Sequence, residues 1–246
     1  KANVQEFGTH VPLVISIPKG LKGKKVDDPV GLIDLAPTLM ELVGSPQAMT
    51  TTGKSLLPVL TQEQHSTHRK YVLTGRERHT HARPDNLGYP ARAIRTKEFL
   101  FVQNFEPDRW PQGDPVPQNP ENDQRSKANG FKSLYPGYHD VDPSPSKEVF
   151  MAMEDSPYFE LAFAKRPQEQ LYDIQKDPFC TLNIAMLPEY KETLVKLKQQ
   201  LLNVLKAQGD PRVSDNPIFD SYPRYSSMRN FKGFNDRGQY NPAFAQ

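Results

Sequence analysis

The most apolar stretch of the chain lies near its start, between Gly8 and Pro18. It reads Val11-Pro-Leu-Val-Ile-Ser-Ile17 and is rich in β-branched residues. A strand with one exposed face alternates apolar and polar positions, whereas a parallel strand covered by helices on both faces is apolar throughout. The run therefore predicts a strand buried on both faces. Because little in the later sequence could pair with it in parallel, we expect its neighbours upstream, in a larger α/β enzyme of which this chain is the C-terminal part.

Helical periodicity follows this run. The sequence Asp-Asp-Pro at residues 27–29 predicts a helix start, and apolar residues recur at helical spacing as far as Val43, where Gly44 ends the pattern. Pro37 lies inside the pattern and should bend the helix or split it in two. We expect this helix to cover one face of the sheet. An apolar island at residues 55–60 indicates one or two further turns of helix.

Four short strands are predicted further along, at residues 71–74, 91–96, 98–104 and 170–174. The second and third are separated by a single turn and should form an antiparallel hairpin. The strongest helix of the chain, at residues 189–208, starts after a proline, ends before a glycine and places leucines along one stripe. These elements together predict a small antiparallel sheet packed against one long helix.

Proline marks the segments that should be neither helix nor strand. The chain has 24 prolines, which concentrate at residues 107–145 and 210–246. Between these segments, residues 146–166 predict a helical stretch that is broken around Pro157. The last segment carries many aromatic residues, which argues that it packs on the folded body, because disordered tails are poor in them.

These patterns divide the chain into three parts. We expect residues 1–65 to form the C-terminal end of a large α/β catalytic domain, with its last strand and helix. Residues 66–212 should form a small α+β subdomain, and residues 213–246 an irregular, aromatic-rich tail. The predicted fold class is therefore α/β with a second, antiparallel subdomain.

Charge and composition exclude several classes of protein. The formal net charge of +2 gives no general affinity for nucleic acid, so binding of anions would need a local cluster of basic groups. No stretch approaches the length of a membrane span. The one cysteine, Cys180, excludes an internal disulfide. It lies in a predicted turn without basic neighbours, which favours a buried structural thiol over a reactive one.

No complete catalytic set occurs in the sequence, but one loop is dense in cationic and imidazole groups. Arginine suits oxyanions because its planar fork can donate two parallel hydrogen bonds, and loops on a rigid sheet often carry binding residues. The alternative is a solvated loop whose arginines pair with Glu77 and Asp85. The residues of this loop are Arg76, Arg78, His79, His81 and Arg83, with Arg92 and Arg95 on the following strand.

Two residues near the start of the chain also allow two interpretations. Lys1 is either an ordinary exposed lysine or a functional cation. His10 is either a satisfied histidine at a strand entrance or a contact for a ligand. Composition does not decide between these interpretations.

Several segments resemble type I sulfatases, in particular the heparan N-sulfatase (sulfamidase) group and its bacterial relatives. The first segment resembles the family's basic residue followed by Gly-x-(Arg/His)-x-Pro, which leads into the last strands of the large sheet. The resemblance extends from Lys1 to about residue 212. The segments that carry it are Lys1-Ala-Asn-Val-Gln-Glu-Phe-Gly-Thr-His-Val-Pro-Leu, Asp34-Leu-Ala-Pro-Thr-Leu, Gly53-Lys-Ser-Leu-Leu-Pro-Val-Leu, Tyr89-Pro-Ala-Arg-Ala-Ile-Arg-Thr, Leu171-Tyr-Asp-Ile-Gln-Lys-Asp-Pro and Asn183-Ile-Ala.

The resemblance implies an alkaline-phosphatase-like sulfatase fold and a formylglycine nucleophile beside a calcium ion. This chain contains neither the Cys/Ser-x-Pro/Ala-x-Arg motif that yields formylglycine nor the family's metal motif. Calcium is therefore expected for the complete enzyme, with ligands outside this chain, and no metal ligand is predicted within it. The family also implies a periplasmic, secreted or lysosomal-type compartment, although the chain carries no targeting signal.

The resemblance also suggests roles for individual residues. Lys1 matches the basic residue that contacts the sulfate oxygens, so it is the predicted catalytic residue; a cation there would stabilise charge developing on the leaving group. His10 matches a position near the rim of the active site. The cationic loop falls where the C-terminal subdomain lines the substrate cleft. The predicted substrate contacts are therefore His10, Arg76, Arg78, His79, His81 and Arg83.

The leading hypothesis is the C-terminal part of a sulfatase that acts on a sulfated glycan such as heparan sulfate. Its expected partners are this glycan and the N-terminal part of the same enzyme, with neither nucleic acid nor membrane. Two alternatives stay open. One is a phosphoester hydrolase of the same superfamily, and the other is a module that binds a polyanionic glycan without turning it over.

Overall fold

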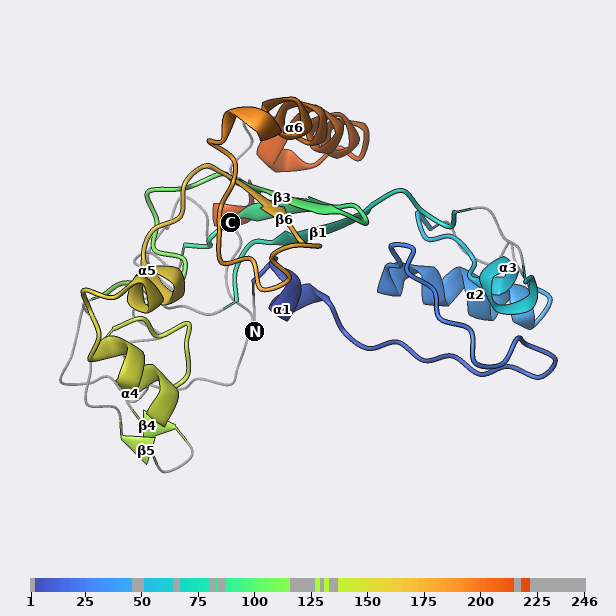
Figure 1. Cartoon of the computed structure of the whole chain (residues 1–246), viewed down its shortest axis with the longest axis horizontal. Helices are drawn as coiled ribbons and strands as arrows, with labels where there is room; N and C mark the ends of the chain where they lie inside the picture. Colours follow the sequence, from blue (N-terminus) through green and yellow to red (C-terminus); the bar gives the residue numbers. More distant parts are fainter. Residues whose placement is uncertain are drawn as a thin grey trace.

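The computed structural model describes residues 3–45, 51–63, 67–79, 83, 87–115, 127–128, 131–132, 137–214 and 218–221. Figure 1 shows a sheet with the long helix α6 (Lys191–Ala207) on one face and the short helix α1 (Glu6–Thr9) on the other. A smaller lobe stands beside this body and contains α2 (Leu35–Leu42) and α3 (Leu57–Thr61). α3 confirms the short helix expected from the apolar island.

The sheet has four antiparallel strands in the order β1-β2-β3-β6. They are β1 (Val72–Arg76), β2 (Ala91–Arg95), β3 (Phe99–Asn104) and β6 (Glu169–Asp173). β2 and β3 form a hairpin in which Ile94 pairs with Phe101. The predicted strands and hairpin are therefore confirmed, with boundaries shifted by one or two residues. The strands β4 (Lys127–Ala128) and β5 (Phe131–Lys132) form a separate short ladder.

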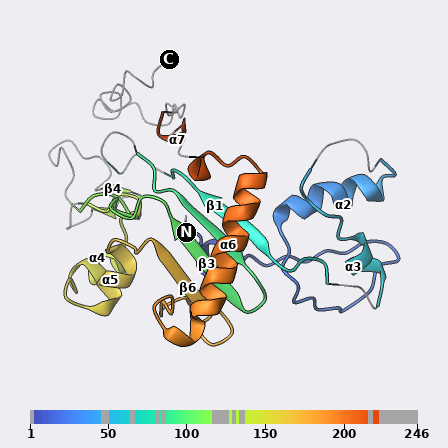
Figure 2. The ribbon, with the colours of Figure 1, turned by 90° about the horizontal axis from the view of Figure 1, so that it is seen from above.

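The two faces of the sheet carry two apolar clusters. On one face, Ile94, Phe101 and Leu171 are fully buried against the leucines of α6. Figure 2 shows that helix lying across the sheet. On the other face, Ala93 and Val102 belong to the second cluster. Side chains alternate between faces along each strand, so both faces of a central strand can be apolar. The α6 leucines buried there are Leu197, Leu201 and Leu205.

The long helix ends as the sequence predicts. The short 3₁₀ turn Pro188–Tyr190 leads into α6, and Gly209 follows the helix with φ of +69°. A residue with a side chain is strained at this left-handed backbone conformation, whereas glycine adopts it freely. Glycine at this position therefore lets the chain leave the helix sharply before residue 210.

The strand predicted at residues 11–17 is not formed in this structure. The segment has no regular secondary structure, and Val14 is 92% exposed. An apolar run indicates that a segment is suited to burial, but a strand also needs a partner for its backbone groups. No strand of the part of the chain that the structure describes pairs with this segment.

The helix predicted from residue 27 begins later. A 3₁₀ turn, Leu32–Asp34, precedes α2, so Pro37 falls in the first turn of the helix. Backbone N–H groups in the first turn have no partner within the helix, so a proline there removes no hydrogen bond. The expected bend or split is therefore absent from α2. Asp34, the residue before α2, makes no capping bond to that helix; its carboxylate accepts hydrogen bonds from the backbone N–H groups of Gly31 and Lys54.

Residues 145–163 form two short helices, as the break at Pro157 predicts. They are α4 (Pro145–Met151) and α5 (Pro157–Phe163), and each starts with a proline that follows a serine cap. Two further short elements follow α6, the 3₁₀ turn Pro211–Val213 and α7 (Ile218–Ser221). The rest of the predicted tail lies outside the described residues. None of the described helices has the length and apolar character needed to cross a membrane.

Candidate anion-binding site

A buried carboxylate, Asp140, organises the cationic loop. Arg76 donates a hydrogen bond to its Oδ2 over 2.6 Å, and Arg83 donates to the same oxygen over 2.9 Å. His79 Nδ1 lies 2.8 Å from the other oxygen, Oδ1. The Asp140 side chain has no exposed surface. Three groups of one loop thus converge on a carboxylate from a distant part of the chain, which fixes the loop against the body.

Arg83 has a structural position in this cluster. Its guanidinium is buried and also donates to the backbone carbonyls of Trp110 and Pro111. Burial lowers the pKa of Arg83, and the nearby Asp140 carboxylate opposes this shift. Arginine nevertheless stays protonated at neutral pH. Arg83, which the sequence predicts as a substrate contact, is enclosed by protein and holds Asp140 in place.

His79 is placed differently, because its ring is partly open to solvent. Its side chain is 39% exposed, although Nδ1 contacts the buried Asp140. An ionised carboxylate only accepts hydrogen bonds, so Nδ1 carries a proton. No described residue contacts Nε2, which is therefore available to a polar group outside the protein. The cluster thus presents an oriented imidazole, and a substrate contact at His79 stays a prediction.

Glu77 and Arg78 belong to a second set of contacts. Glu77 accepts hydrogen bonds over 2.7 Å from both Arg92 and Arg212, and Arg78 donates to the backbone carbonyl of Phe219 over 3.4 Å. The alternative of arginines paired with Glu77 therefore applies to Arg92. It does not apply to Arg76 and Arg83, which use Asp140, and Asp85 lies outside the described residues.

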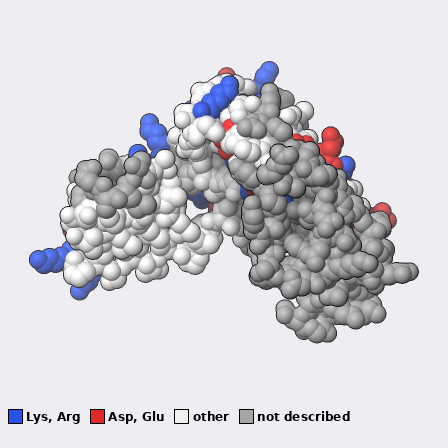
Figure 3. Space-filling model, turned by 180° about the vertical axis from the view of Figure 1, so that it is seen from behind, with Lys and Arg blue, Asp and Glu red and all other residues white. Residues whose placement is uncertain are grey.

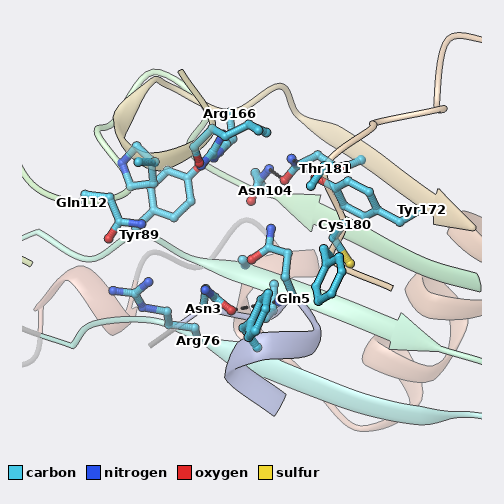
Figure 4. A pocket seen from close by; sticks show the side chains of 18 residues that line it. Asn3, Gln5, Arg76, Tyr89, Asn104, Gln112, Arg166, Tyr172, Cys180 and Thr181 are labelled. Atoms are coloured by element: carbon cyan, nitrogen blue, oxygen red, sulfur yellow. Dashed lines mark hydrogen bonds between the residues drawn. The ribbon is translucent and has the colours of Figure 1, made fainter. Parts of the chain in front are cut away.

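A cavity of about 260 Å³ opens beside the Asp140 cluster, on the face of the sheet opposite α6. Figure 4 shows its lining, which comes from the segment of α1, from the sheet, from the end of α5 and from the loop at Cys180. No aspartate or glutamate belongs to this lining. Its polar side chains are the amides of Asn3, Gln5, Asn104, Gln112 and Gln170, the hydroxyls of Tyr89, Tyr172 and Thr181, and the guanidinium groups of Arg76 and Arg166.

Two arginines give the cavity its charge. Arg76 enters it from β1, and Arg166 enters it from the segment after α5; in Figure 4 they lie on either side of Tyr89. Arg76 shares the single carboxylate of Asp140 with Arg83, so this cluster keeps an excess of positive charge. Arg166 donates to backbone carbonyls, among them that of Glu160 over 3.2 Å. The shared carboxylate and the absence of Asp and Glu from the cavity lining both favour an anionic ligand.

Tyr89 adds a hydrogen-bond donor to the wall of the cavity. Burial raises the pKa of Tyr89 to about 12, although the nearby Arg166, Arg83 and Arg76 oppose the shift. Its hydroxyl is therefore protonated at neutral pH and can donate to an acceptor in the cavity. The side chain is 4% exposed, which places this donor away from bulk water.

Cys180 also borders the cavity but is not a nucleophile. The thiol is free and buried, as the sequence suggests. Burial raises the pKa of Cys180 to about 11. Because the thiolate is the reactive species, a thiol with this pKa stays inert at neutral pH.

The remaining predicted site residues lie in two other places. His10 pairs through Nδ1 with Glu6 over 2.8 Å, and Glu6 also accepts from Arg95. His10 is thus held by Glu6, and it does not line the cavity. Lys1 and His81 lie outside the described residues. The sequence analysis missed Asp140, Tyr89 and Arg166, which the fold brings to the loop from elsewhere.

The described part of the chain offers no metal site. No group of three or more His, Cys, Asp or Glu residues within it could hold a metal ion. The residues present here therefore do not fit the calcium ion that the resemblance implies, and calcium stays a prediction for the complete enzyme. The chemistry of this site is that of fixed cations and hydrogen-bond donors.

Basic side chains do not form a broad patch on the face seen in Figure 3. The Lys and Arg side chains of the described residues stand apart there, over the smaller lobe and near the edges of the body.

The polar part of the cavity lining, which consists of guanidinium, amide and hydroxyl groups without carboxylates, is chemically suited to an oxyanion. Comparison with known families identifies the class further. Residues 1–122 match the family described as N-sulphoglucosamine sulphohydrolase, C-terminal. This match spans just under half of the chain and assigns residues 1–122 to the C-terminal region of a sulfatase family. The resemblance found in the sequence is confirmed.

Two sequence relatives agree with this assignment. An ulvan-active sulfatase of Formosa agariphila is 28% identical over 219 residues, which cover 89% of this chain and 37% of that protein. The human N-sulphoglucosamine sulphohydrolase is 25% identical over 230 residues, which cover 87% of this chain and 40% of that protein. A solved structure of a 2-O GAG sulfatase is 18% identical, with a TM-score of 0.41, and the match covers 74% of this chain and 26% of that one. The chain thus spans about two fifths or less of these relatives.

Proposed function

We propose that this chain is the C-terminal part of a sulfatase that removes sulfate from a glycosaminoglycan-type glycan such as heparan sulfate. In this proposal the chain contributes residues of the substrate cleft. The nucleophile and the calcium ligands lie in a preceding part of the enzyme, which we expect in a periplasmic, secreted or lysosomal-type compartment. The observation that carries the proposal is the carboxylate-free cavity beside the oriented His79, within a chain of the sulfatase family.

Lys1 is the proposed catalytic residue. It lies outside the described residues and precedes Asn3, which lines the cavity, by two positions in the sequence. A fixed cation at this position would stabilise the negative charge that develops as the sulfate bond breaks.

His79 supplies a second proposed contact with the substrate. Asp140 holds its ring through Nδ1, and a neutral imidazole then offers Nε2 as an acceptor for a sugar hydroxyl. Orienting groups of this kind increase the rate of a reaction by fixing the substrate in position. We propose this role for His79 and a charge-setting role for Arg76.

The names of the relatives indicate the class of substrate. One relative is named for N-sulphoglucosamine, and another is named as active on ulvan. Since these two names point to different glycans, we propose a sulfated saccharide as the common substrate. The position of the sulfate group is then set by the preceding part of the enzyme together with this cleft.

The test measures sulfate release from N-sulfated and O-sulfated saccharides by the full-length product of the gene. Lys1→Ala should lower turnover by about 100-fold or more, as removal of one preorganised charge contact does. Lys22→Ala, which removes an exposed lysine elsewhere, is the matched control and should leave the rate unchanged. A Lys1→Ala rate equal to that of the wild type would reject the role of this lysine.

The alternatives give different results in the same assay. A phosphoester hydrolase would release phosphate from a phosphate monoester and no sulfate from any saccharide. A module that only binds glycan would retain a heparin-derived saccharide, with strong salt dependence, and release nothing. Sulfate release by the 246-residue chain alone would contradict the assignment of the nucleophile to a preceding part.

A further inference from the structure

Three buried hydrogen-bond donors near Tyr89 have no acceptor among the described residues. They are Nε of Arg76, Nη1 of Arg83 and the hydroxyl of Tyr89. A buried donor without an acceptor destabilises the folded state, so folded proteins leave few of them. Three of them in one cluster indicate that an acceptor from outside this part of the chain belongs there.

The three donors form one group because of how their side chains are held. The guanidinium carbon of Arg83 lies 5.7 Å from the centre of the Tyr89 ring, and Arg76 and Arg83 share Asp140. Arg76 and Tyr89 both line the cavity, whereas Arg83 lies behind them. The site is thus built from rigid groups whose other hydrogen bonds are already made.

The opposite wall of the cavity supplies a further cation. Arg166 lines it and makes its hydrogen bonds to backbone carbonyls, with no carboxylate partner among the residues described. A guest near Tyr89 therefore lies between two guanidinium groups (Figure 4). Neutral acceptors such as water could satisfy the donors, but only an anion also balances this charge.

We propose that this cavity binds an oxyanion group, sulfate or carboxylate, carried by one saccharide unit. Arg76 and Arg166 would hold its charge, and the Tyr89 hydroxyl would donate to one of its oxygens. The volume of about 260 Å³ is below the range of about 300–1,000 Å³ for drug-sized ligands, which suits a single unit of a chain. Naming the carrier as a saccharide rests on the proposed function, whereas oxyanion binding itself does not.

Calorimetric titration of the full chain with small anions tests the proposal. The probes are N-sulfoglucosamine, glucuronate and inorganic sulfate, with N-acetylglucosamine as the uncharged comparison. The charged sugars should bind and the uncharged sugar should not. Binding of inorganic sulfate alone would show an oxyanion site that does not recognise a sugar, and would overturn the saccharide part of the proposal.

Two substitutions locate the binding. Tyr89→Phe removes only the hydroxyl, and Arg166→Gln removes the charge of the opposite wall. Each should weaken binding of the charged sugars about tenfold or more, as loss of a hydrogen bond to a charged group does. Lys196→Gln removes the same charge from the exposed face of α6 and should leave binding unchanged. Equal affinity in all three variants would overturn the proposed site.

The stability of the chain without ligand provides an independent result. Because Tyr89→Phe removes a buried donor that has no acceptor, the variant should melt at the same temperature as the wild type or higher. A lower melting temperature in the absence of anions would show that this hydroxyl already has a partner, which contradicts the proposal.

The cavity and the proposed function can fail separately. If the full-length enzyme released sulfate but bound no anion at this cavity, the proposed cavity site would be wrong. If it bound the anion but released no sulfate, the proposed function would be wrong.

Discussion

Two fully buried aspartates, Asp34 in the smaller lobe and Asp140 beside the sheet, show how similar ion clusters can serve different purposes. Asp34 accepts hydrogen bonds from Arg69 and from His68. Asp140 accepts from two arginines and contacts His79. Both side chains have no exposed surface. Each cluster therefore combines one carboxylate with guanidinium and imidazole groups.

The difference lies in what each cluster leaves exposed. The His68 side chain is only 5% exposed, whereas His79 is 39% exposed. The cluster at Asp140 also leaves two guanidinium nitrogens without acceptors, and no atom of the Asp34 cluster is in that state among the described residues. The Asp34 cluster is therefore closed, whereas the Asp140 cluster retains hydrogen-bond donors that could bind a ligand, as the proposed site requires.

The largest expected effect is the loss of stability on breaking the closed cluster. Asp34→Ala leaves Arg69 buried without its carboxylate, and removing one partner of a buried ion pair costs about 3–5 kcal/mol. Chemical denaturation followed by circular dichroism measures this change in the free energy of unfolding. Asp27→Ala, which removes an exposed partner of Lys25, is the control and should cost about 1 kcal/mol or less. A loss below about 1 kcal/mol for Asp34→Ala would contradict a stabilising role.

A pH dependence of the smaller lobe should follow from the same carboxylate. Burial alone would raise the pKa of Asp34, but hydrogen bonds from Arg69, from the backbone N–H groups of Lys54 and Gly31, and from His68 hold it well below its ordinary value. The stabilisation is therefore complete above the unfolded pKa of about 3.9 and is lost as the pH falls through the lower folded value.

Unfolding measured between about pH 5 and pH 2 tests this dependence. A carboxylate with a strongly lowered pKa contributes about 2–3 kcal/mol. The wild type should lose that amount over the acidic range, and Asp34→Asn should lose less, because it has no proton to take up. If the free energy of unfolding fell equally with pH in both proteins, the acid sensitivity would belong to other groups, such as Glu6, whose pKa is also lowered.

The fold of the α+β body is predictable because its signals are local. The leucine stripe of α6 and the apolar strands β2 and β3 fix which surfaces must be buried, and the glycine after α6 fixes where the helix ends. The apolar run at residues 11–17 forms no strand here, because a pattern contains no information about the partner strand. The later start of α2 could not be predicted either, because Asp34, the residue before the helix, accepts a hydrogen bond from a segment 20 residues away, which no periodicity reveals.

The candidate site is only partly predictable for the same reason. The density of basic residues identifies Arg76 and His79, but it does not distinguish them from Arg83, which is enclosed. That distinction depends on Asp140, which lies 64 positions from Arg76 in a proline-rich segment without any motif. Tyr89 and Arg166 likewise gain their roles because the fold buries them and brings them together in the cavity lining. Both effects depend on tertiary structure.

The smallest expected effect on stability comes from replacing either of two histidines, His68 or His79, with glutamine. His68→Gln should lower the free energy of unfolding by about 1–2 kcal/mol, since it disturbs a buried hydrogen bond to Asp34. His79→Gln should change stability by less than about 0.5 kcal/mol, because part of its ring already faces water.

The same two substitutions should affect KM in the reverse order when the full-length enzyme releases sulfate from a saccharide. His79→Gln should raise KM several-fold, because glutamine places its polar atoms differently from the oriented imidazole, whereas His68→Gln should leave KM unchanged. If both variants changed KM equally, the openness of the Asp140 cluster would have no bearing on substrate binding. If neither changed KM while His79→Gln lowered stability, the two clusters would share one structural role.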